Sequence, residues 1–283
     1  MRERVTLPID KANRKRIAAI KASPSYAKAF EDIKFLKSDG LRPLRLQLEL
    51  LKPESVLERE GVKATVVVFG SARIPEMAHA SKLVETLEAK LRSKPRDNGL
   101  TERLAAARAL LSKSRYYEEA RRFGALVSKH FASKGVVVCT GGGPGIMEAA
   151  NRGASQTGAK SVGLNITLPF EQDPNPYISP ELCFQFHYFA VRKMHFLLRA
   201  KALVVFPGGY GTMDELFEAL TLIQTRKFEA IPVILVGKAY WSRAVDFRFM
   251  ADEGVVDAQD LKLFHIVETA EEALGILKKS MCV

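Results

Sequence analysis

The segment Phe206–Glu215 combines residue types that suit binding and chemistry at a phosphorylated ligand. Three of the four residues at 208–211 are glycine, so their amide groups can approach a ligand without side chains in the way. A helix beginning here would add further amide donors and a positive dipole end, with Thr212 as a candidate cap. Glu215 follows in the same helix, where its carboxylate could act on the part of the ligand next to the phosphate. The alternative is an acidic residue that only favours the helix dipole.

A second glycine-rich segment, Gly141–Gly145, follows the apolar run Gly135–Thr140 and precedes a predicted helix. Both segments therefore have the order strand, glycine turn, helix. In a parallel sheet such turns emerge at the same strand ends, so the two can line one crevice. Ile146 stands where the G-x-G-x-x-G pattern requires glycine, which argues against a dinucleotide site.

Basic residues lie on the predicted helix Phe189–Ala200, which leads directly into the apolar strand before the first glycine segment. Arg192 and Lys193 are candidates to reach the crevice. His195 shares a face with Arg192, and a packed or surface role is the preferred interpretation for it. The first predicted core strand also ends in a turn, Gly70–Arg73, at the usual position of a nucleotide-binding βα turn.

These residues need a sheet to position them, and the apolar runs predict a doubly wound, Rossmann-like parallel sheet of α/β class. Residues 61–283 form the predicted nucleotide-binding domain, and residues 1–60 a helical N-terminal arm. Residues 76–93 and 101–133 are predicted as two long helices, which is more than one crossover requires. We therefore expect 76–133 to be a helical insertion.

The composition narrows the partners that we expect. The net charge is +11, but the basic excess lies in two helical regions, 1–60 and 78–134, where acidic residues are interspersed. A nucleic-acid polymer is therefore not the expected partner, and an anionic small ligand explains the charge equally well. Three scattered cysteines and the charged N-terminus predict a cytoplasmic protein without a disulfide framework. No apolar run is long enough to predict a membrane span.

Three motifs in this order resemble those of the LONELY GUY family, whose members are often labelled lysine decarboxylase-like. They are Gly141-Gly142-Gly143-x-Gly145-Ile146-Met147, Arg192-Lys193, and Pro207-Gly208-Gly209-Tyr210-Gly211-Thr212-x-x-Glu215. The resemblance covers about residues 64–280, and its last motif is highly specific. It implies a Rossmann-like homodimer or higher oligomer that hydrolyses nucleoside 5′-monophosphates to free base and ribose 5-phosphate. The arm and the insertion resemble those of longer bacterial members, so either AMP-like nucleotides or cytokinin riboside 5′-monophosphates are expected substrates.

The resemblance implies that Glu215 and Arg192 are the catalytic pair, near the dimer interface. We expect the nucleotide to be bound by residues of the glycine turns and their neighbours, namely Gly141, Gly142, Gly143, Gly145, Lys193, Gly208, Gly209, Gly211, Thr212 and Ser71. Neither a cofactor nor a metal ion is expected.

The chemistry fits these residues independently of the resemblance. Cleaving an N-glycosidic bond builds positive charge on the ribose, and a carboxylate near C1′ stabilises that charge and can activate water. Arg192 could bind phosphate or ribose oxygens and keep Glu215 ionised. The leaving base needs a proton, and its donor stays open. Asp214, Glu171 and Glu148 are candidates, although a structural role explains each one better.

Two other classes of function remain as alternatives. A non-catalytic protein of the same fold could hold a nucleotide or a phosphorylated cofactor in this crevice, but it would have little use for Glu215. Decarboxylation of lysine would need pyridoxal phosphate on a Schiff-base lysine, and no lysine lies in a recognisable site for it. An oligomeric scaffold built on the helical arms would leave both glycine segments unexplained.

Overall fold

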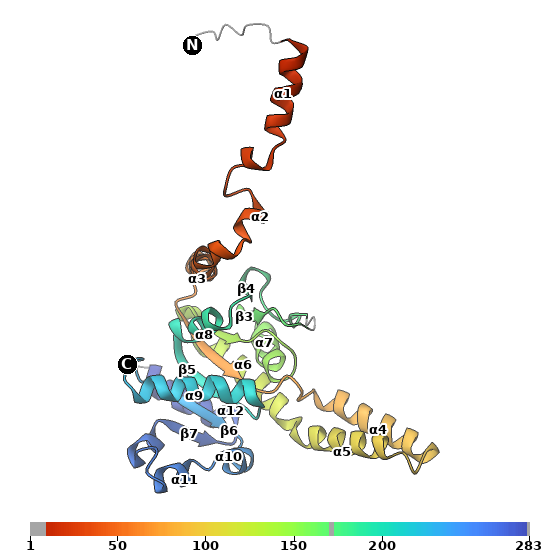
Figure 1. Ribbon diagram of the computed structural model, residues 1–283. Coiled ribbons are helices and arrows are strands. Elements are labelled where there is room, and N and C mark those ends of the chain that lie inside the picture. The colour runs from red at the N-terminus through yellow and green to blue at the C-terminus, as the bar shows by residue number, and fades with distance from the viewer. Residues whose placement is uncertain (1–9, 170–172, 282–283) are drawn as a thin grey trace. The chain divides into compact units, whose positions relative to one another are not determined.

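A single parallel sheet organises the computed structural model, which describes residues 10–169 and 173–281. Seven strands pair in the order β4-β3-β2-β1-β5-β6-β7, and every pairing is parallel. The strands are β1 (Ala64–Phe69), β2 (Val136–Thr140), β3 (Ser161–Ile166), β4 (Cys183–Phe186), β5 (Ala200–Val205), β6 (Val233–Val236) and β7 (Phe264–Val267). The predicted doubly wound, Rossmann-like sheet is confirmed (Figure 1).

The strand order reverses direction between β1 and β5. From β1 the chain moves outward through β2 and β3 to β4, and then returns to the other side of β1 with β5. Loops that leave neighbouring strands in opposite directions open a crevice at the carboxyl ends of those strands. The turns after β1 and β5, which contain Ser71 and the 207–212 glycine segment, both start at this edge.

Twelve α-helices are described, and those from α4 onward connect or flank these strands (Figure 1). They are α1 (Lys11–Lys21), α2 (Ile33–Leu36), α3 (Arg42–Arg59), α4 (Met77–Ser93), α5 (Asn98–Lys113), α6 (Arg115–Phe131), α7 (Ile146–Ser155), α8 (Phe189–Leu198), α9 (Tyr210–Gln224), α10 (Lys238–Ala244), α11 (Phe247–Asp252) and α12 (Ala270–Met281). Short 3₁₀ helices lie at Pro24–Tyr26, Asp39–Leu41, Ala132–Lys134, Pro180–Leu182 and Ala258–Lys262.

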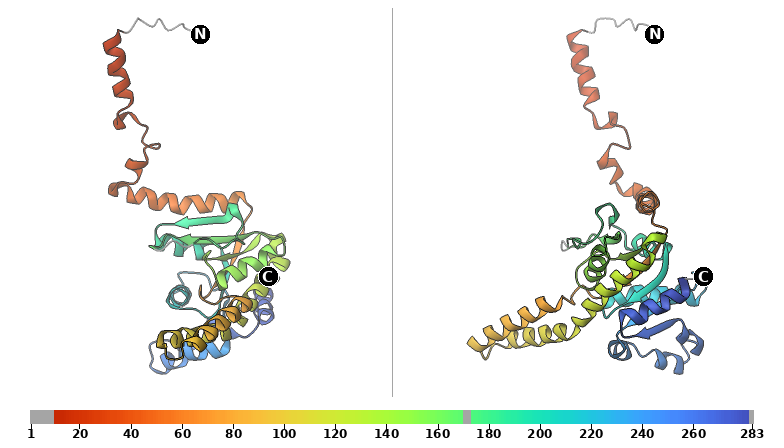
Figure 2. Two further views of the ribbon diagram at one scale, coloured as in Figure 1. Left: turned by 90° about the vertical axis from the view of Figure 1, so that its right-hand side faces the viewer. Right: turned by 180° about the vertical axis from the view of Figure 1, so that it is seen from behind.

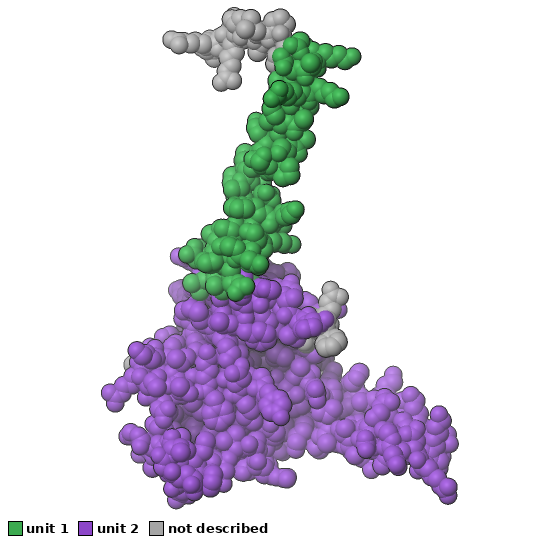
Figure 3. All heavy atoms as spheres, viewed as in Figure 1, with its two compact units in different colours: residues 1–51 green, residues 52–283 purple. Residues whose placement is uncertain are grey.

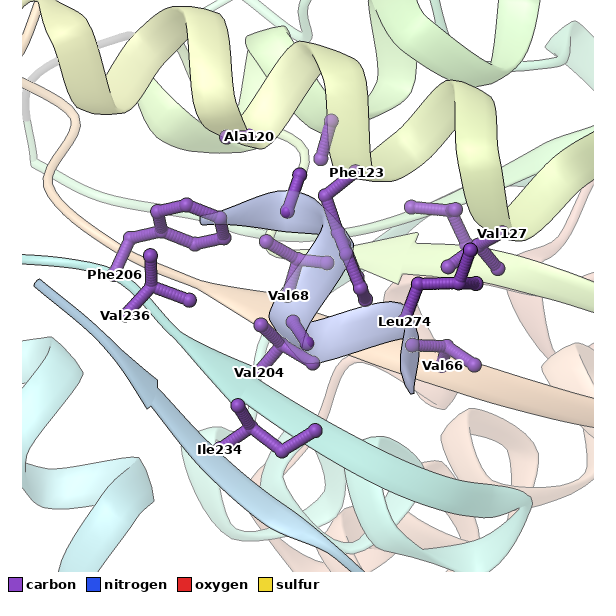
Figure 4. Close-up of a cluster of buried hydrophobic side chains, with 14 of the residues drawn as sticks. Val66, Val68, Ala120, Phe123, Val127, Val204, Phe206, Ile234, Val236 and Leu274 are labelled. Atoms are coloured by element: carbon purple, nitrogen blue, oxygen red, sulfur yellow. The ribbon is translucent and has the colours of Figure 1, made fainter. Parts of the chain in front are cut away.

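The main core lies between one face of the sheet and helices α6, α7 and α12. Val66 and Val68 of β1 pack there with Phe123 of α6 and Leu274 of α12 (Figure 4). Successive side chains of a strand point to opposite faces, so Phe69 points to the other face. Its ring meets that of Phe196 in α8, with centroids 4.9 Å apart. Every residue of β1 is buried, as expected for a strand covered on both faces.

The chain divides into two compact units, residues 1–51 and 52–283, and the boundary falls within α3 (Figure 3). The described part of the first unit contains α1, α2 and the beginning of α3. Residues 27–36, where helix-like spacing is present, form a helix only at Ile33–Leu36, whose start is capped by the Asp32 side chain. Residues 44–50 are helical, as predicted from their helix-forming residues.

The predicted long helix 101–133 is two helices, broken at Ser114. The first of them, α5, pairs with α4 in a hairpin that extends away from the sheet (Figures 1 and 2). Leu87 and Leu104 belong to a small apolar cluster inside this hairpin, which is separate from the main core. The second helix, α6, belongs to the main core, because Phe123 and its neighbours face the sheet. Only α4 and α5 therefore project as extra structure.

The segment 238–252 also contains two helices in place of one. Residues Lys238–Ala244 form α10, and a new helix, α11, starts after Asp246, whose carboxylate accepts a hydrogen bond from the Phe249 amide at 2.9 Å. Trp241 anchors α10, because it is fully buried and its indole donates to the Val236 carbonyl at 3.0 Å.

The described residues contain neither a membrane-spanning helix nor a cluster of metal-binding side chains. None of the helices in this part of the chain combines the length and the apolar character that a bilayer span needs. No group of three or more His, Cys, Asp or Glu side chains there could hold a metal ion.

Candidate active site

A cleft of about 940 Å³ opens at the carboxyl ends of the central strands. Its walls come from the turns that follow β1, β2, β5 and β6. The predicted site residues that line it are Ser71, Gly141, Arg192, Gly208, Gly209, Gly211, Thr212 and Glu215. Gly142, Gly143, Gly145 and Lys193 are not part of this lining. The structure thus brings the two predicted catalytic side chains together with the second glycine segment and only the first residue of the other.

The turn from β5 into α9 has its carbonyl groups fixed from three directions. The Pro207 carbonyl accepts the Ser71 amide at 3.0 Å, and the Gly208 carbonyl accepts the Tyr240 hydroxyl. The Gly209 carbonyl accepts the Met213 amide at 3.0 Å, which is the first hydrogen bond of α9. Each carbonyl and the next amide point in opposite directions across a trans peptide. The amides of residues 208–210 are therefore held facing away from these partners.

Within the described chain, the amides of residues 208–212 donate to no protein acceptor. The helix cap is Gly209, and no side chain caps the helix start. The expectation that Thr212 caps the helix is wrong, because Thr212 lies inside the first turn with its side chain folded against Gly208. The first turn of α9 thus keeps donors and a partial positive charge available at the cleft, which suits an anion.

Two glycines of this turn are not required by the fold. A Cβ atom built on Gly209 or Gly211 would meet nothing within 4 Å. Neither residue has the positive φ that would favour glycine. Because both line the cleft, the missing side chains leave space for a ligand and not for another part of the protein.

In the Gly141–Gly145 segment, the carbonyls of the first three residues and the Gly142 amide are bound by other parts of the protein. The buried Asn175 accounts for much of this, since its amide donates to the Gly142 carbonyl at 2.8 Å and its side chain to the Gly143 carbonyl at 3.1 Å. The Gly142 amide donates to the Thr140 hydroxyl at 3.0 Å. Gly142 has φ +77°, so it occupies the left-handed region that favours glycine.

Ser71 joins the two glycine segments through its backbone. Its amide holds the Pro207 carbonyl, and its carbonyl accepts the Ile146 amide at 3.1 Å. The first amide of α7 is therefore used by the protein. Gly145, at φ +71°, lets the chain pass, because a Cβ there would lie 2.4 Å from the Ser71 oxygen.

Arg192 spans the cleft floor from α8. Its Nε donates to the Leu164 carbonyl at 2.7 Å and its Nη2 to the Gly141 carbonyl at 3.3 Å. Its guanidinium also lies over the Phe196 ring, 5.1 Å from the centroid. These contacts fix the side chain while other N–H groups of the fork remain for a ligand. Burial lowers the pKa of Arg192, and the charge of Glu215 opposes that shift.

Glu215 is half-buried in the cleft wall. Burial raises the pKa of Glu215 to about 7, although the positive charges of Lys193 and Arg192 favour its ionised form. A carboxyl group with a pKa near the working pH can exchange a proton readily, which is what general acid–base chemistry requires. The charges of Arg192 and Glu215 attract each other, so each group favours the ionised form of the other.

Lys193 points to a neighbouring depression on the α9 surface. Its ammonium group lies 2.8 Å from Asp214 Oδ1 and 3.2 Å from Glu218 Oε2. Burial opposes its charge, but the hydrogen bonds to these two carboxylates outweigh burial and raise the pKa of Lys193. Lys193 therefore acts on Glu215 only through its charge, because its ammonium group is paired with Asp214 and Glu218.

The three other acidic candidates have different surroundings. Asp214 lines the cleft and pairs with Lys193. Glu148 accepts the Tyr117 hydroxyl at 2.7 Å and is outside the cleft lining. Glu171 lies outside the described residues. His195 is buried, with Nδ1 3.4 Å from Glu54 Oε1, so the structural interpretation preferred from the sequence fits it.

Three residues that shape this site were not among the predicted site residues. Met147, which ends the first motif, and Tyr240 line the cleft, and Asn175 holds the Gly141–Gly145 segment. Tyr240 had a detectable signal, because Gly237 ends a strand at the same sheet edge and α10 begins directly after it. Asn175 had no comparable signal, since it lies in a polar, proline-rich loop far away in the sequence.

A family model described as possible lysine decarboxylase matches residues 147–277. The matched segment contains the Arg192-Lys193 pair and the whole motif from Pro207 to Glu215. The resemblance inferred from the three motifs is thereby confirmed, although the match begins just after the Gly141–Gly145 segment.

Curated relatives extend the comparison. The pyrimidine/purine nucleotide 5′-monophosphate nucleosidase of Escherichia coli strain K12 is 30% identical over 158 residues, which cover 51% of this chain and 34% of that protein. Proteins of the same name from strains O6:H1 and O157:H7 match equally. The chain thus spans about a third of the length of the curated relatives it matches.

Solved structures with a similar backbone include two proteins described by their link to the molybdenum cofactor. The molybdenum cofactor carrier protein of Chlamydomonas reinhardtii has a TM-score of 0.48 at 18% identity, covering 78% of this chain and 99% of that one. The molybdenum cofactor binding protein of Rippkaea orientalis has a TM-score of 0.44 at 21% identity, covering 59% of this chain and 88% of that one.

Proposed function

We propose that this protein hydrolyses the N-glycosidic bond of nucleoside 5′-monophosphates to give free base and ribose 5-phosphate. One observation carries the proposal: the unpaired amides of residues 208–212 line the same cleft as the Glu215 carboxyl group. The amides suit a phosphate, and the carboxylate suits the reacting carbon of the sugar attached to it. The name of the Escherichia coli relatives, nucleotide 5′-monophosphate nucleosidase, supports the same substrate class.

The 5′-phosphate would bind at the first turn of α9, where free amides and the helix dipole both favour an anion. Arg73, which also lines the cleft, adds a cationic side chain. Binding energy from the phosphate would then position the ribose against Glu215, one turn further along the helix. The glycines at 209 and 211 fit this role because their space is open to the cleft.

Glu215 would act on the sugar in its ionised form. As the bond between C1′ and the base nitrogen breaks, positive charge develops on the ribose and a nearby carboxylate stabilises it. A water molecule adds to C1′ and loses a proton, which Glu215 can accept because its pKa is about 7. The departing base takes up a proton, so atoms and charge balance. Arg192, fixed by two carbonyls, would hold ribose or phosphate oxygens.

Among the substrates in this class, we propose ordinary AMP-like nucleotides first and cytokinin riboside 5′-monophosphates second. The name of the Escherichia coli relatives refers to pyrimidine and purine nucleotides, which supports this order. The family label of lysine decarboxylase fits the site less well. Lys193, whose charge acts on Glu215, is held as a charged ammonium by Asp214 and Glu218, whereas a Schiff base forms from a neutral amine.

The alternative is a protein that binds a nucleotide or phosphorylated cofactor without reacting with it. Such a binder would use the amides of residues 208–212 equally well. It would gain nothing from a buried carboxyl beside the anion, because burying an ionisable group costs free energy. Glu215 therefore favours the hydrolase.

The test is to incubate purified protein with AMP, GMP, CMP, UMP and isopentenyladenosine 5′-monophosphate and to measure free base by chromatography. We expect base release by the native protein and its loss in Glu215→Ala. The matched control is Asp214→Asn, which changes the adjacent, more exposed carboxylate. Nucleotide binding without base release from any of the five substrates would contradict the hydrolase and favour the binding protein.

We further propose that the chain forms a homodimer or a higher homo-oligomer. Large apolar side chains are exposed on α8, where Phe189 is 52%, Met194 49% and Leu198 50% exposed, and Phe189 also lines the cleft. Exposed apolar side chains that gather on one helix suit an interface. Light scattering coupled to size exclusion tests the proposal, and a mass near 31.4 kDa at micromolar concentration would contradict it.

A further inference from the structure

Tyr240 links two elements that meet at the cleft. It lies in α10, and its hydroxyl donates a hydrogen bond to the Gly208 carbonyl in the turn before α9. The side chain is half-buried and lines the cleft. No motif in the sequence points to it, and the proposed reaction does not require it to contact the nucleotide.

The position of this hydroxyl is set by a firmly anchored helix. Trp241 is fully buried and bound to the Val236 carbonyl, and the Tyr240 ring packs edge-on against it with centroids 5.2 Å apart. Gly237, at φ +104°, turns the chain from β6 directly into α10. The donor therefore has little freedom to move away from the turn.

Holding the Gly208 carbonyl also holds the Gly209 amide, because both belong to one rigid peptide plane. The other two carbonyls of the turn are fixed by backbone amides, Ser71 for Pro207 and Met213 for Gly209. Tyr240 supplies the side-chain contact in this set. Without it, the 208–209 peptide could rotate between two glycines, which restrict rotation less than any other residue.

We propose that Tyr240 is a positioning residue that aims the Gly209 amide at the 5′-phosphate. The inference rests on the proposed phosphate site, and it adds a residue from α10 to it. Tyr240 acts through the backbone of the turn and not by touching the substrate. Its hydroxyl, and not its ring, carries the effect.

The variant that isolates the hydroxyl is Tyr240→Phe, which keeps the ring and its packing. Losing one hydrogen bond should weaken binding of inorganic phosphate, measured by calorimetry, about five- to tenfold. KM for AMP should rise by a similar factor, because phosphate binding is present in both ground and transition states, while kcat should change less.

The matched control is Tyr116→Phe. Tyr116 belongs to α6, and its ring packs against Gly237, next to the start of α10. Its hydroxyl accepts a hydrogen bond from the Arg115 side chain at 2.7 Å, outside the cleft lining. This variant loses a hydroxyl at the same end of the helix without changing the turn. We expect unchanged phosphate affinity and unchanged KM in it.

Three outcomes would overturn the inference: unchanged phosphate affinity in Tyr240→Phe, an equal loss in Tyr116→Phe, or a fall in melting temperature that accounts for the loss. These outcomes are separate from failure of the proposed hydrolase. If the native protein binds phosphate but releases no base, weaker phosphate binding in Tyr240→Phe still supports the role of Tyr240.

Discussion

The two glycine segments of this protein have similar sequences but different surroundings. Gly141–Gly145 follows β2 and Pro207–Thr212 follows β5, and each leads into a helix at the same sheet edge. In the first segment, Arg192 and Asn175 bind the carbonyls of Gly141, Gly142 and Gly143, and Thr140 binds the Gly142 amide. In the second, the carbonyls of residues 207–209 are bound, and the amides of residues 208–212 have no acceptor among the described residues.

The two segments also differ in why they need glycine. At Gly142 and Gly145 a positive φ and close neighbours exclude a side chain. At Gly209 and Gly211 neither condition applies, and only the cleft lies beyond the missing Cβ. A glycine turn after a parallel strand can thus serve the protein's own packing or a ligand, and the atoms that lie beyond the missing Cβ distinguish the two.

The largest effect that we predict lies on the ligand side of this comparison. Glu215→Gln should lower kcat for base release from AMP by about a thousandfold, because it removes the charge that stabilises the ribose and activates water. Steady-state kinetics with chromatographic detection of base would measure this. Asp214→Asn serves as control and should lose much less, and equal losses in both variants would remove the special role of Glu215.

On the structural side, Gly145→Ala should destabilise the fold by about 3 kcal/mol, since it combines an unfavourable φ with a clash. The new Cβ would lie 2.4 Å from the Ser71 oxygen. Gly158→Ala is the control, because Gly158 has φ +75° but no atom near its Cβ, and about 1 kcal/mol is expected. Urea unfolding measures both, and equal values would contradict the assigned packing role of Gly145.

The pH profile tests Glu215 without a substitution. If the ionised carboxylate is the active form, kcat/KM should rise with pH through a midpoint near 7 and fall about tenfold for each unit below it. The direction follows from burial, which raises the pKa of Glu215 to about 7 and keeps part of it protonated at neutral pH. A rate that falls as pH rises through this range would assign Glu215 as a proton donor instead.

The smallest predicted effect is a substitution that raises the stability of the fold but weakens substrate binding. Gly211→Ala should stabilise the fold by about 0.5 kcal/mol, because alanine favours a helix more than glycine and the site is open. The same methyl group would occupy ligand space, so KM for AMP should rise severalfold. Thermal unfolding and kinetics on one preparation would measure both. A loss of stability would mean that Gly211, like Gly145, is needed by the fold.

The sheet could be predicted from the sequence because its strands are short apolar runs, such as Val66–Phe69, bounded by glycine turns. The break at Ser114 could not, because helix-forming residues continue on both sides and only packing decides where the helix ends. The insertion was expected to include α6 for the same reason. Its apolar face fits the sheet, and that becomes visible only in three dimensions.

The candidate site was predictable in its residue types and not in its hydrogen bonds. The motif ending in Glu215 pointed to the free amides of α9, and Arg192 reaches the same cleft. The commitment of Gly142 to Asn175 depends on a contact across 33 residues, which no local pattern contains. The placement of Lys193 between two carboxylates was hidden likewise, since Asp214 and Glu218 belong to another helix.

The most direct test of the contrast between the two segments is to follow their glycine amides during phosphate binding. Protein labelled with ¹⁵N-glycine would be titrated with inorganic phosphate and then, as Glu215→Gln, with AMP. We predict that the amide signals of Gly208, Gly209 and Gly211 shift with saturation while those of Gly142 and Gly143 stay unchanged. Shifts confined to Gly142 and Gly143 would contradict the assignment of the ligand to the turn before α9.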